Sequence, residues 1–353
     1  MGRYSNKYDK NQRKKTQNKI DKSEKSKNYE QSFEKTWDEF ESSIIKDDCD
    51  IAIVTQITAN HEGKTFYLYD IVNQKDVIAK MTKSLPKELS KSIVVGDNVL
   101  YSSSEEGTYI ERRENRKNKF ARIKSIDDQI TNGPYREQIF AVNLDYGIIV
   151  VSACKPKFNP GMVERYLLLF EYHGVTPIIC ITKTDIQKLA QEEYQLFLDL
   201  GIEIYFITPQ ENDELERLKN TIENKRVVFV GTSGVGKTSL TNNIYGAEVG
   251  KEGETHKKTG FGQHTTTASC AYKWKDNSFI IDTPGIMNLN LVEVNRQNLK
   301  YLFSDFLELN NECKYKKCTH IIEPDCAVQS AYVEGRLAKS RYDFYIQLFE
   351  KIQ

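Results

Sequence analysis

The sequence lacks three features that would place it in familiar classes of protein. It has no net charge, because 50 acidic residues balance 50 basic ones, and it has no apolar run long enough to span a membrane. It also lacks a signal-peptide pattern. Four of the seven cysteines are scattered in or near apolar runs, at Cys49, Cys154, Cys180 and Cys270. We therefore expect neither a membrane-spanning protein nor one built on a disulfide framework.

A glycine-rich loop follows a short apolar run in the second half of the chain. Residues 225–230 (KRVVFV) read as a strand, residues 231–236 as a turn, and residues 237–245 as the start of a helix. Backbone N–H groups of such a loop point at phosphates, while Lys237 reaches the β- and γ-phosphates and Thr238 ligates Mg²⁺. The predicted phosphate-binding residues are Gly231, Thr232, Ser233, Gly234, Val235, Gly236, Lys237, Thr238 and Ser239.

A second phosphate motif, DTPG, follows the apolar run at residues 278–281. Asp282 stands at a strand end, where it can hold Mg²⁺ through water, and the Gly285 N–H can meet the γ-phosphate. The loop between the two motifs is rich in threonine, and one of its hydroxyls can complete the Mg²⁺ shell. The candidates in residues 262–267 (GQHTTT) are Thr265, Thr266 and Thr267, of which we favour Thr266.

The tetrapeptide TKTD follows the strand-like run at residues 176–181. A carboxylate at Asp185 can accept hydrogen bonds from the ring N–H and the exocyclic amine of guanine. Adenine offers neither in that geometry, and the mispairing costs about 1–3 kcal/mol. The predicted base-binding residues are Thr182, Lys183, Thr184 and Asp185. In ordinary guanine-nucleotide switch proteins this element follows the phosphate loop, so the order here predicts a circularly permuted GTPase that binds GTP and GDP.

Apolar runs alternate with helical stretches from residue 146 onward, which predicts a parallel sheet covered on both faces. The expected strands are residues 147–153, 176–181, 202–207 and 225–230, and the expected helices are residues 160–172, 186–200 and 211–224.

Near the C-terminus the remaining cysteines form the pattern C-x4-C-x-H-x5-C with one histidine. Three thiolates and one imidazole suit a closed, tetrahedral Zn²⁺ site, which leaves no position open for catalysis. The predicted ligands are Cys313, Cys318, His320 and Cys326. A disulfide framework is the competing interpretation.

The region before residue 125 shows five short strand patterns separated by turn signals. They fit a small barrel, and the pattern alone suits both the oligonucleotide-binding (OB) and the SH3-like types. The patterns lie at residues 51–58, 64–71, 77–81, 95–99 (a turn into a strand) and 108–112. A basic run surrounds Phe120 and suits contact with an RNA backbone, although a solvated charged edge explains it equally well. Its members are Arg112, Arg113, Arg116, Lys117, Lys119 and Arg122.

The order GTSGVGKTSLTN, GQHTTT, DTPG, then CTHIIEPDCAV and RYDFY, closely resembles the RsgA (YjeQ) family of ribosome small subunit-dependent GTPases. The resemblance runs from about residue 50 to the C-terminus. It implies an OB-type β-barrel, a circularly permuted α/β P-loop GTPase and a mainly α zinc-binding domain. It also implies action on the 30S ribosomal subunit late in its maturation, with contacts to 16S rRNA and hydrolysis stimulated by the subunit.

The expected organisation is an arm at residues 1–48, a barrel at 49–125, a GTPase domain at 126–290 and a zinc domain at 291–353. Residues 1–28 hold ten Lys or Arg residues against three acidic ones and almost no apolar residues, so the arm is expected to be disordered. It either touches rRNA or only keeps the chain soluble. We expect a cytoplasmic protein that is a monomer away from the ribosome.

Hydrolysis needs a group that orients the attacking water, and the usual glutamine is missing. Ile286 stands where many switch GTPases carry it, so intrinsic turnover is expected near the ~10⁻⁴ s⁻¹ of unassisted switch proteins. The resemblance offers His264 as the catalytic residue instead. A surface histidine that merely packs is the alternative.

The chain departs from the family pattern at three places. Thr182 replaces the usual Asn, which weakens a hydrogen bond between strands, and the fifth nucleotide element near Thr208-Pro209 is unconvincing. Asp325 occupies a position that is often Gly, where a left-handed backbone would be slightly strained. Two other functions remain open, a GTP-dependent metal-delivery protein and a non-hydrolysing RNA-binding scaffold. The first requires an open metal site, and the second has no need of Lys237, Thr238 and Asp282.

Overall fold

The computed structural model describes residues 49–61, 63–82, 93–123, 137–208, 213–246, 269–282, 296 and 299–352, called the described residues below. The predicted arm at residues 1–48 lies outside them. Within them, none of the helices has both the length and the apolar composition needed to cross a membrane.

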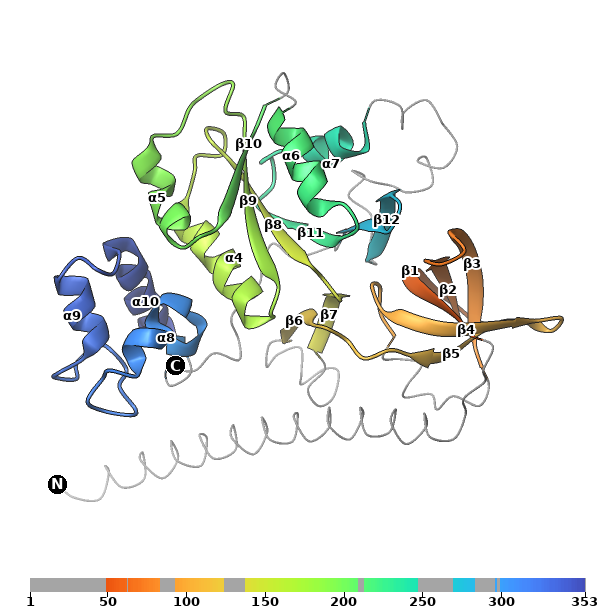
Figure 1. The fold of residues 1–353 in the computed structure, drawn as a ribbon, viewed down its shortest axis with the longest axis horizontal. Coiled ribbons are helices and arrows are strands. Elements are labelled where there is room, and N and C mark those ends of the chain that lie inside the picture. Colours follow the sequence, from red (N-terminus) through yellow and green to blue (C-terminus); the bar gives the residue numbers. More distant parts are fainter. Residues whose placement is uncertain are drawn as a thin grey trace.

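The N-terminal part of the described chain is a five-stranded barrel (Figure 1). Its strands are β1 (Asp50–Asn60), β2 (Gly63–Asp70), β3 (Lys75–Met81), β4 (Asn98–Ser104) and β5 (Gly107–Arg113). The ring closes through β1–β2, β2–β3, β3–β5, β5–β4 and β4–β1 pairs, of which the β3–β5 pair is parallel. Apolar side chains such as Val54, Phe66 and Ile110 fill the interior. The predicted OB-type barrel is confirmed.

The central part is a mostly parallel sheet flanked by helices (Figure 1). Across the sheet the strands are β10 (Glu203–Ile207), β9 (Thr176–Thr182), β8 (Tyr146–Ser152), β11 (Arg226–Val230), β13 (Ser278–Asp282) and the antiparallel β12 (Cys270–Lys275). The helices are α4 (Pro160–Tyr172), α5 (Gln191–Asp199), α6 (Asp213–Ile222) and α7 (Lys237–Tyr245). Ile148 and Ile149 are adjacent on β8 yet belong to different apolar clusters, because successive strand side chains point to opposite faces. The predicted α/β sheet covered on both faces is confirmed.

Several elements differ from the sequence-based expectation. The helix expected at residues 186–200 begins only at Gln191, because a turn follows β9 and the Ile186 N–H donates to the Lys183 carbonyl at 3.1 Å. The Glu193 carboxylate then accepts from the Ala190 N–H at 3.2 Å and fixes the helix start. The sequence analysis missed the β6–β7 hairpin and the strand β12, which pairs with β13 and with β1. The hairpin consists of β6 (Lys119–Ile123) and β7 (Glu137–Val142), on either side of the expected domain boundary at residue 125.

A buried polar loop before β4 joins the barrel to the sheet. Two donors from the sheet side meet the Gly96 carbonyl at 3.0 Å, namely Asn143 Nδ2 and Arg226 NH1, and Arg226 NH2 donates to Asn98 Oδ1 at 2.7 Å. Gly96 has φ of +93°, and a Cβ there would lie 2.6 Å from the Val142 carbonyl oxygen. Since Arg226 opens β11, the barrel is fastened to the strand that leads into the glycine-rich loop.

Part of the basic run suggested as an RNA contact serves this junction. The Arg116 guanidinium donates to the buried Asp97 carboxylate at 2.7 and 2.8 Å, and Arg113 NH1 lies 3.9 Å from the same carboxylate. Phe120 is fully buried and stacks on Phe170 with ring centroids 5.2 Å apart. Phe120 is therefore not presented to a base.

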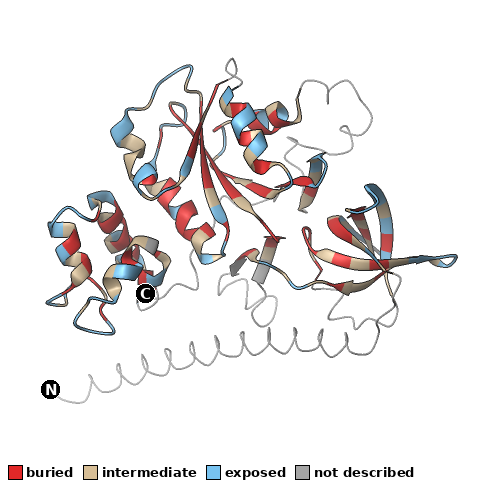
Figure 2. Cartoon of the chain, viewed as in Figure 1, coloured by how far each residue is buried: buried red, intermediate tan, exposed pale blue. Residues whose placement is uncertain are grey.

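The C-terminal part is mainly α-helical, as predicted. It contains the 3₁₀ turn η3 (Leu299–Leu302) and the helices α8 (Ser304–Asn310), α9 (Ala327–Val333) and α10 (Lys339–Lys351). Its apolar residues face inward around Phe303, Phe306 and Tyr345 (Figure 2). Leu168 of α4 belongs to the same cluster, so the C-terminal part packs against the central part.

Candidate nucleotide site and metal centre

The predicted phosphate-binding and base-reading segments meet at one edge of the sheet. Strands β9, β8, β11 and β13 run parallel in this order, so their carboxyl ends lie side by side. β9 ends at Thr182, β11 leads into Gly231, and β13 ends at Asp282. Segments that are 50 to 100 residues apart in the chain are thus brought together by the strand order, as the sequence order of the motifs requires.

The glycine-rich loop has the backbone of a phosphate cradle. Gly231, Gly234 and Gly236 all have positive φ, at +146°, +78° and +99°, a region that side chains with a Cβ rarely adopt. Gly236 stands as N-cap of α7, whose first N–H groups face the loop. A cradle of this type binds anions through backbone N–H groups and the positive end of the helix. Thr238 and Ser239 are exposed in the first turn, and Thr232 is half-buried in the loop.

Gly231→Ala tests how closely the loop approaches β8. A Cβ at Gly231 would lie 2.2 Å from the Val150 carbonyl oxygen, so the loop must shift. We expect a loss of about 1–3 kcal/mol in the free energy of unfolding and a larger loss of nucleotide affinity. Urea unfolding and nucleotide titration measure the two effects.

The matched control is Gly161→Ala in α4, where the new Cβ would lie 3.5 Å from Asn159 Oδ1, an ordinary contact. Its stability should stay within about 1 kcal/mol of wild type. If Gly231→Ala behaved like this control, the tight cradle described above would be wrong.

Lys237 is held inside the loop. Its ammonium donates to the carbonyls of Gly231 and Thr232, both at 2.8 Å. Burial lowers the pKa of Lys237, and the charge of Asp282 opposes this shift, so the two predicted phosphate-site residues are electrostatic neighbours. The arrangement places one cation and one carboxylate beside the cradle, as a Mg²⁺–phosphate group needs.

The base-reading segment is bound directly to the phosphate loop. The Lys183 ammonium donates to the Gly234 carbonyl at 2.8 Å and to the Lys155 carbonyl, and Lys183 itself adopts a left-handed φ of +60°. Beside it, Asp185 is exposed and half-buried Thr184 has a buried hydroxyl with no hydrogen-bond partner among the described residues. The Asp185 carboxylate is therefore exposed to solvent two residues after Lys183, whose side chain is bound to the phosphate loop.

Thr182 keeps a bridge that the sequence analysis expected to be weakened by the loss of Asn. Its hydroxyl oxygen lies 2.5 Å from the Val235 carbonyl oxygen and 3.1 Å from the Val151 carbonyl oxygen, so its single proton can be donated to either. The hydroxyl thus joins β9 either to the phosphate loop or to β8, and the shorter distance favours the loop. The sequence analysis missed the backbone acceptors at Val151 and Lys155, because carbonyl groups leave no signal in a sequence.

Several predicted site residues lie outside the described residues, and the predicted fifth nucleotide element is only partly described. His264, Thr266 and Gly285 lie outside, as do Thr265 and Thr267. Of the uncertain fifth element, Thr208 is buried directly after β10, whereas Pro209 is not described.

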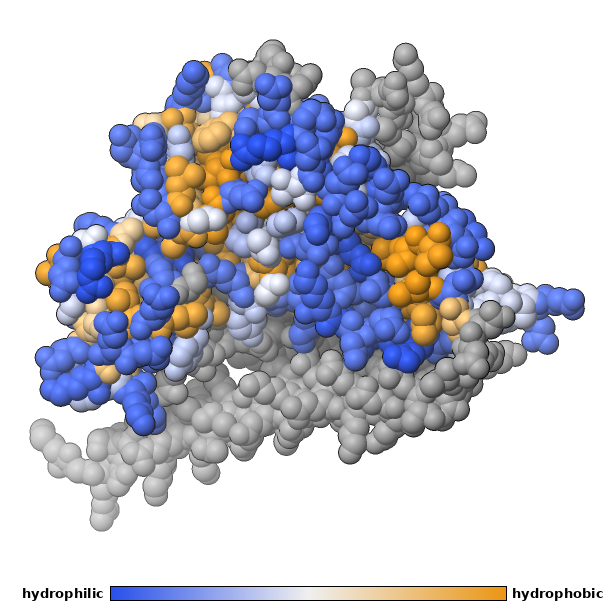
Figure 3. Space-filling view, in the orientation of Figure 1, coloured by the Kyte–Doolittle hydropathy of each residue, from blue (hydrophilic) through white to orange (hydrophobic). Residues whose placement is uncertain are grey.

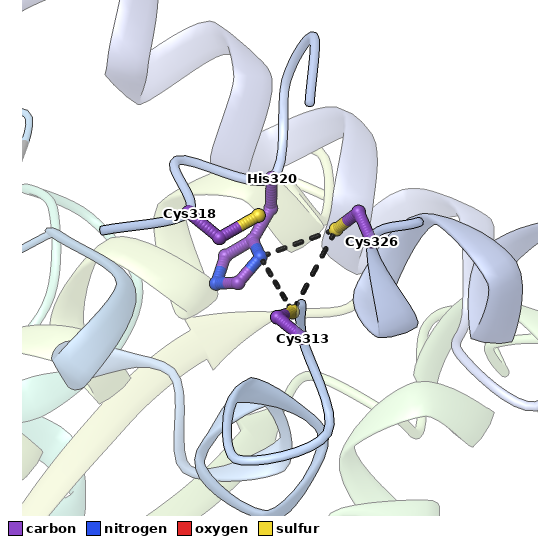
Figure 4. Close-up of side chains that lie close together, drawn as sticks. All are labelled: Cys313, Cys318, His320 and Cys326. Atoms are coloured by element: carbon purple, nitrogen blue, oxygen red, sulfur yellow. Dashed lines mark hydrogen bonds between the residues drawn. The ribbon is translucent and has the colours of Figure 1, made fainter. Parts of the chain in front are cut away.

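The four predicted metal ligands converge in the C-terminal part (Figure 4). Their donor atoms all lie within 4.8 Å of one another. His320 Nδ1 is 3.3 Å from Cys326 Sγ and 3.6 Å from Cys313 Sγ, and the two sulfur atoms are 4.0 Å apart. A tetrahedral ion with Zn–S near 2.3 Å and Zn–N near 2.0 Å has ligand-to-ligand edges of roughly 3.5–3.8 Å. The cluster can hold a metal ion, and its donors suit zinc.

The surrounding structure supports this cluster. Burial lowers the pKa of His320 to about 4, so its imidazole is neutral at physiological pH, as metal ligation requires. The Tyr342 hydroxyl donates to the His320 carbonyl at 2.6 Å, which helps to hold that residue at φ of +62°. Asp325 has φ of +56°, the left-handed backbone expected from its position. Three of the four ligands are buried, so the site is closed.

The fold and the two nucleotide segments define a circularly permuted P-loop GTPase, because the base-reading segment precedes the phosphate loop while both lie at one sheet edge. The RsgA GTPase family model matches residues 113–292. The chain belongs to the RsgA GTPase family.

Relatives of known name agree with this assignment. The chain is 30% identical over 312 residues to the small ribosomal subunit biogenesis GTPase RsgA of Chlorobaculum parvum, covering 85% of this chain and 97% of the relative. It is 31% identical over 292 residues to the protein of the same name from Haemophilus influenzae, covering 80% and 81%. The crystal structure of YjeQ from Thermotoga maritima superposes with a TM-score of 0.68 at 25% identity, covering 86% of this chain and 99% of that one.

Proposed function

We propose that this GTPase binds the 30S ribosomal subunit and assists its late maturation, with hydrolysis stimulated by the subunit. The observation that supports the proposal is the direct Lys183–Gly234 hydrogen bond, which joins the predicted base-reading segment to the predicted phosphate loop. The names of the relatives supply the small subunit as partner.

Within this site we assign roles by position. The phosphate loop and Lys237 hold the β- and γ-phosphates, Asp185 reads guanine, and the Gly285 N–H meets the γ-phosphate. Thr238, Asp282 and Thr266, the last from the threonine loop, would hold magnesium. The ion would supply positive charge that offsets the negative charge of the phosphates. Zinc is held by the Cys₃His cluster as a structural ion.

We assign the catalytic role to His264, and 30S-stimulated hydrolysis tests both the residue and the partner. Wild type should be slow alone, near the ~10⁻⁴ s⁻¹ of unassisted switch proteins, and strongly stimulated by purified 30S subunits. His264→Ala should lose about 10²–10⁴-fold of the stimulated rate while binding GTP normally.

The control is His61→Ala, since His61 is an exposed histidine in the turn between β1 and β2. Its stimulated rate should equal that of wild type. Stimulation that survives in His264→Ala would leave the partner in place and remove the histidine from the mechanism. An absence of stimulation in wild type would contradict the ribosomal proposal.

RNA contact is assigned to the barrel and to the arm at residues 1–48, through 16S rRNA. Phosphate contacts release counterions, so affinity for the subunit should fall steeply with salt. Removal of residues 1–28 should reduce the salt dependence if the arm touches rRNA, and leave it unchanged if the arm only aids solubility.

We retain the division into residues 1–48, 49–125, 126–290 and 291–353 as a proposal, together with a cytoplasmic monomer away from the ribosome. Limited proteolysis with mass spectrometry tests the boundaries, and sedimentation tests the monomer. A metal-delivery function is not favoured, because three of the four metal ligands are buried and the cluster leaves no open position.

A further inference from the structure

The barrel and the C-terminal part are joined to the central sheet in different ways. The barrel is joined to the sheet by hydrogen bonds of 2.7–3.0 Å from Arg226 and Asn143 and by the β1–β12 strand pair. Gly96 lies so close to Val142 at this junction that any larger residue would displace the backbone. Among the described residues, the C-terminal part contacts α4 through the apolar side chain of Leu168 and through a cluster of charges around Arg341. The junction between the C-terminal part and α4 is therefore partly charged, as is typical of interfaces between domains that move relative to each other.

The charged cluster centres on Arg341 of α10, which is completely buried. Its Nε donates to Asp305 Oδ1 of α8 at 3.2 Å, within the C-terminal part. Its other two nitrogens face α4, with NH1 3.9 Å from Glu164 Oε2 and NH2 3.9 Å from Glu171 Oε2. Phe303 closes the remaining side, its ring centroid 4.5 Å from the guanidinium carbon. Arg341 is thus the link between α10 and α4.

This cluster is not balanced. Three carboxylates surround one guanidinium, and neither Arg341 NH1 nor NH2, nor Glu164 Oε2, has a hydrogen-bond partner among the described residues. Buried ion pairs with long, incomplete contacts stabilise weakly, because the cost of desolvation offsets most of the Coulomb attraction. Removing the cation altogether is far worse, since it leaves carboxylates buried without compensation. The cluster therefore holds the two parts together only while Arg341 stays in place.

The apolar half of the junction is Leu168, which points from α4 into the C-terminal cluster with Leu299 and Phe303. It is fully buried, although α4 otherwise packs on the central sheet. This apolar contact and the charged cluster together hold the junction closed.

Helix α4 also leads to the nucleotide site. The segment 153–159 joins β8 to α4, and it touches the base-reading segment at two points. The Ala153 N–H donates to the Thr182 carbonyl at 2.9 Å, and the Lys155 carbonyl accepts from Lys183. α4 begins at Pro160, so Glu164 lies only one turn from this segment. A nucleotide that repositions Lys183 therefore acts on the helix that carries the junction.

We propose that Arg341 forms a releasable lock between the C-terminal part and α4, and that guanine nucleotide binding shifts the lock through residues 153–159. The barrel stays fixed to the sheet, and the C-terminal part is the element that moves. The coupling rests on the proposed nucleotide site, whereas the lock itself does not. Coupling of this kind is reciprocal: if nucleotide changes docking, then opening the lock changes nucleotide affinity by the same factor.

The lock should respond to pH. Burial raises the pKa of Glu164 to about 7, the charge of Arg341 opposes this shift, and Asp305 adds to it. Glu171 is the fourth charged group at the cluster. Because Glu164 binds its proton more tightly when docked than its ordinary pKa of 4.5 implies, docking is favoured below about 4.5 and weakened as the pH rises through about 7. Glu164→Gln, which cannot ionise, should remain docked at pH 8 and lose this dependence.

Hydrogen exchange along α4 and small-angle scattering of the full chain test the lock. Arg341→Met should expand the molecule and speed exchange of the α4 amides around Glu164 and Leu168 by at least about a hundredfold. Leu168→Ala acts from the opposite side of the junction and changes no residue of the C-terminal part, so it decides between opening of the junction and unfolding if Arg341→Met unfolds the C-terminal part. Glu164→Gln should act in the opposite sense at pH 8, slowing exchange by at least about tenfold.

The control is Lys339→Met, on the same helix two residues before Arg341. Lys339 is exposed and pairs with Asp343 at 2.8 Å, away from α4. It should match wild type in every measurement. If Arg341→Met and Leu168→Ala also matched wild type, the lock would be excluded.

Nucleotide titration tests the coupling. GDP or a non-hydrolysable GTP analogue should change α4 exchange in wild type, and Arg341→Met should change the affinity for that nucleotide by the same factor, about five- to a hundredfold. Nucleotide that binds without changing α4 exchange would overturn the coupling. A wild-type protein that binds no guanine nucleotide would instead contradict the proposed function, while the docking measurements would still judge the lock.

Discussion

Removing the bound metal should unfold the C-terminal part and leave the barrel and the central sheet standing. The four ligands lie in the segment between α8 and α9, and Cys318 and Cys326 form part of the buried cluster around Phe306 and Tyr345. Structural zinc supplies about 10–16 kcal/mol of apparent binding energy in zinc-finger peptides, most of which is folding energy. Without the ion, no bond joins the four ligand side chains, and the packing of α8, α9 and α10 around them loses this support.

Zinc content by mass spectrometry, followed by hydrogen exchange before and after chelation, measures this effect. Cys318→Ser should release zinc and remove protection from residues 299–352, whereas Cys154→Ser, in a half-buried cysteine outside the cluster, should do neither. Chelation that removes zinc yet leaves exchange in residues 299–352 unchanged would show that the ion is not structural.

Asp185→Asn should exchange the preferred base. The carboxylate can accept from both donors of guanine, but an amide has one acceptor and presents an N–H to the second donor. We expect affinity for GTP and GDP to fall by on the order of 10²–10³, while affinity for xanthine nucleotides rises, because xanthine offers a carbonyl to the new N–H. The protein fold should not change, since Asp185 is exposed.

Titration with fluorescent guanine and xanthine nucleotides measures the exchange. Asp199→Asn is the matched control, because it removes an exposed carboxylate at the end of α5, away from the strand ends. An Asp185 variant that kept wild-type affinity for GTP would show that another residue reads the base.

The prediction for the metal site and the prediction for Asp185 both rest on local sequence patterns, which can be recognised without a structure. Fixed spacing placed the four Cys₃His ligands, and a strand–turn–helix pattern placed α7 at residues 237–245, where the structure has it. The same local logic placed α4 at residues 160–172, since Asn159 caps the helix and Pro160 suits its first turn. Short-range chemistry of this kind is complete within a few residues.

Interactions between distant segments could not be predicted. The basic run at residues 112–122 suited either an RNA contact or a solvated charged edge. In the structure, Arg116 forms an ion pair with Asp97 and Phe120 is buried in the core. The hairpin β6–β7 was missed because its two strands are separated by residues 124–136, and β12 because it mixes lysines with aromatic residues. Whether a charged or aromatic residue is exposed depends on what folds against it.

The sequence by itself determined the class of this protein: the permuted order of TKTD and the glycine-rich loop, the donor set of the metal centre, and the alternation that makes an α/β sheet. Those properties follow from residue type and spacing, which the chain carries before it folds. Only the tertiary structure decided that Thr182 restores the bridge expected from Asn, that Lys183 fastens the base-reading segment to the phosphate loop, and that Arg341 links α10 to α4. Each of these depends on atoms far apart in the chain, which only the packing of the folded protein brings close together.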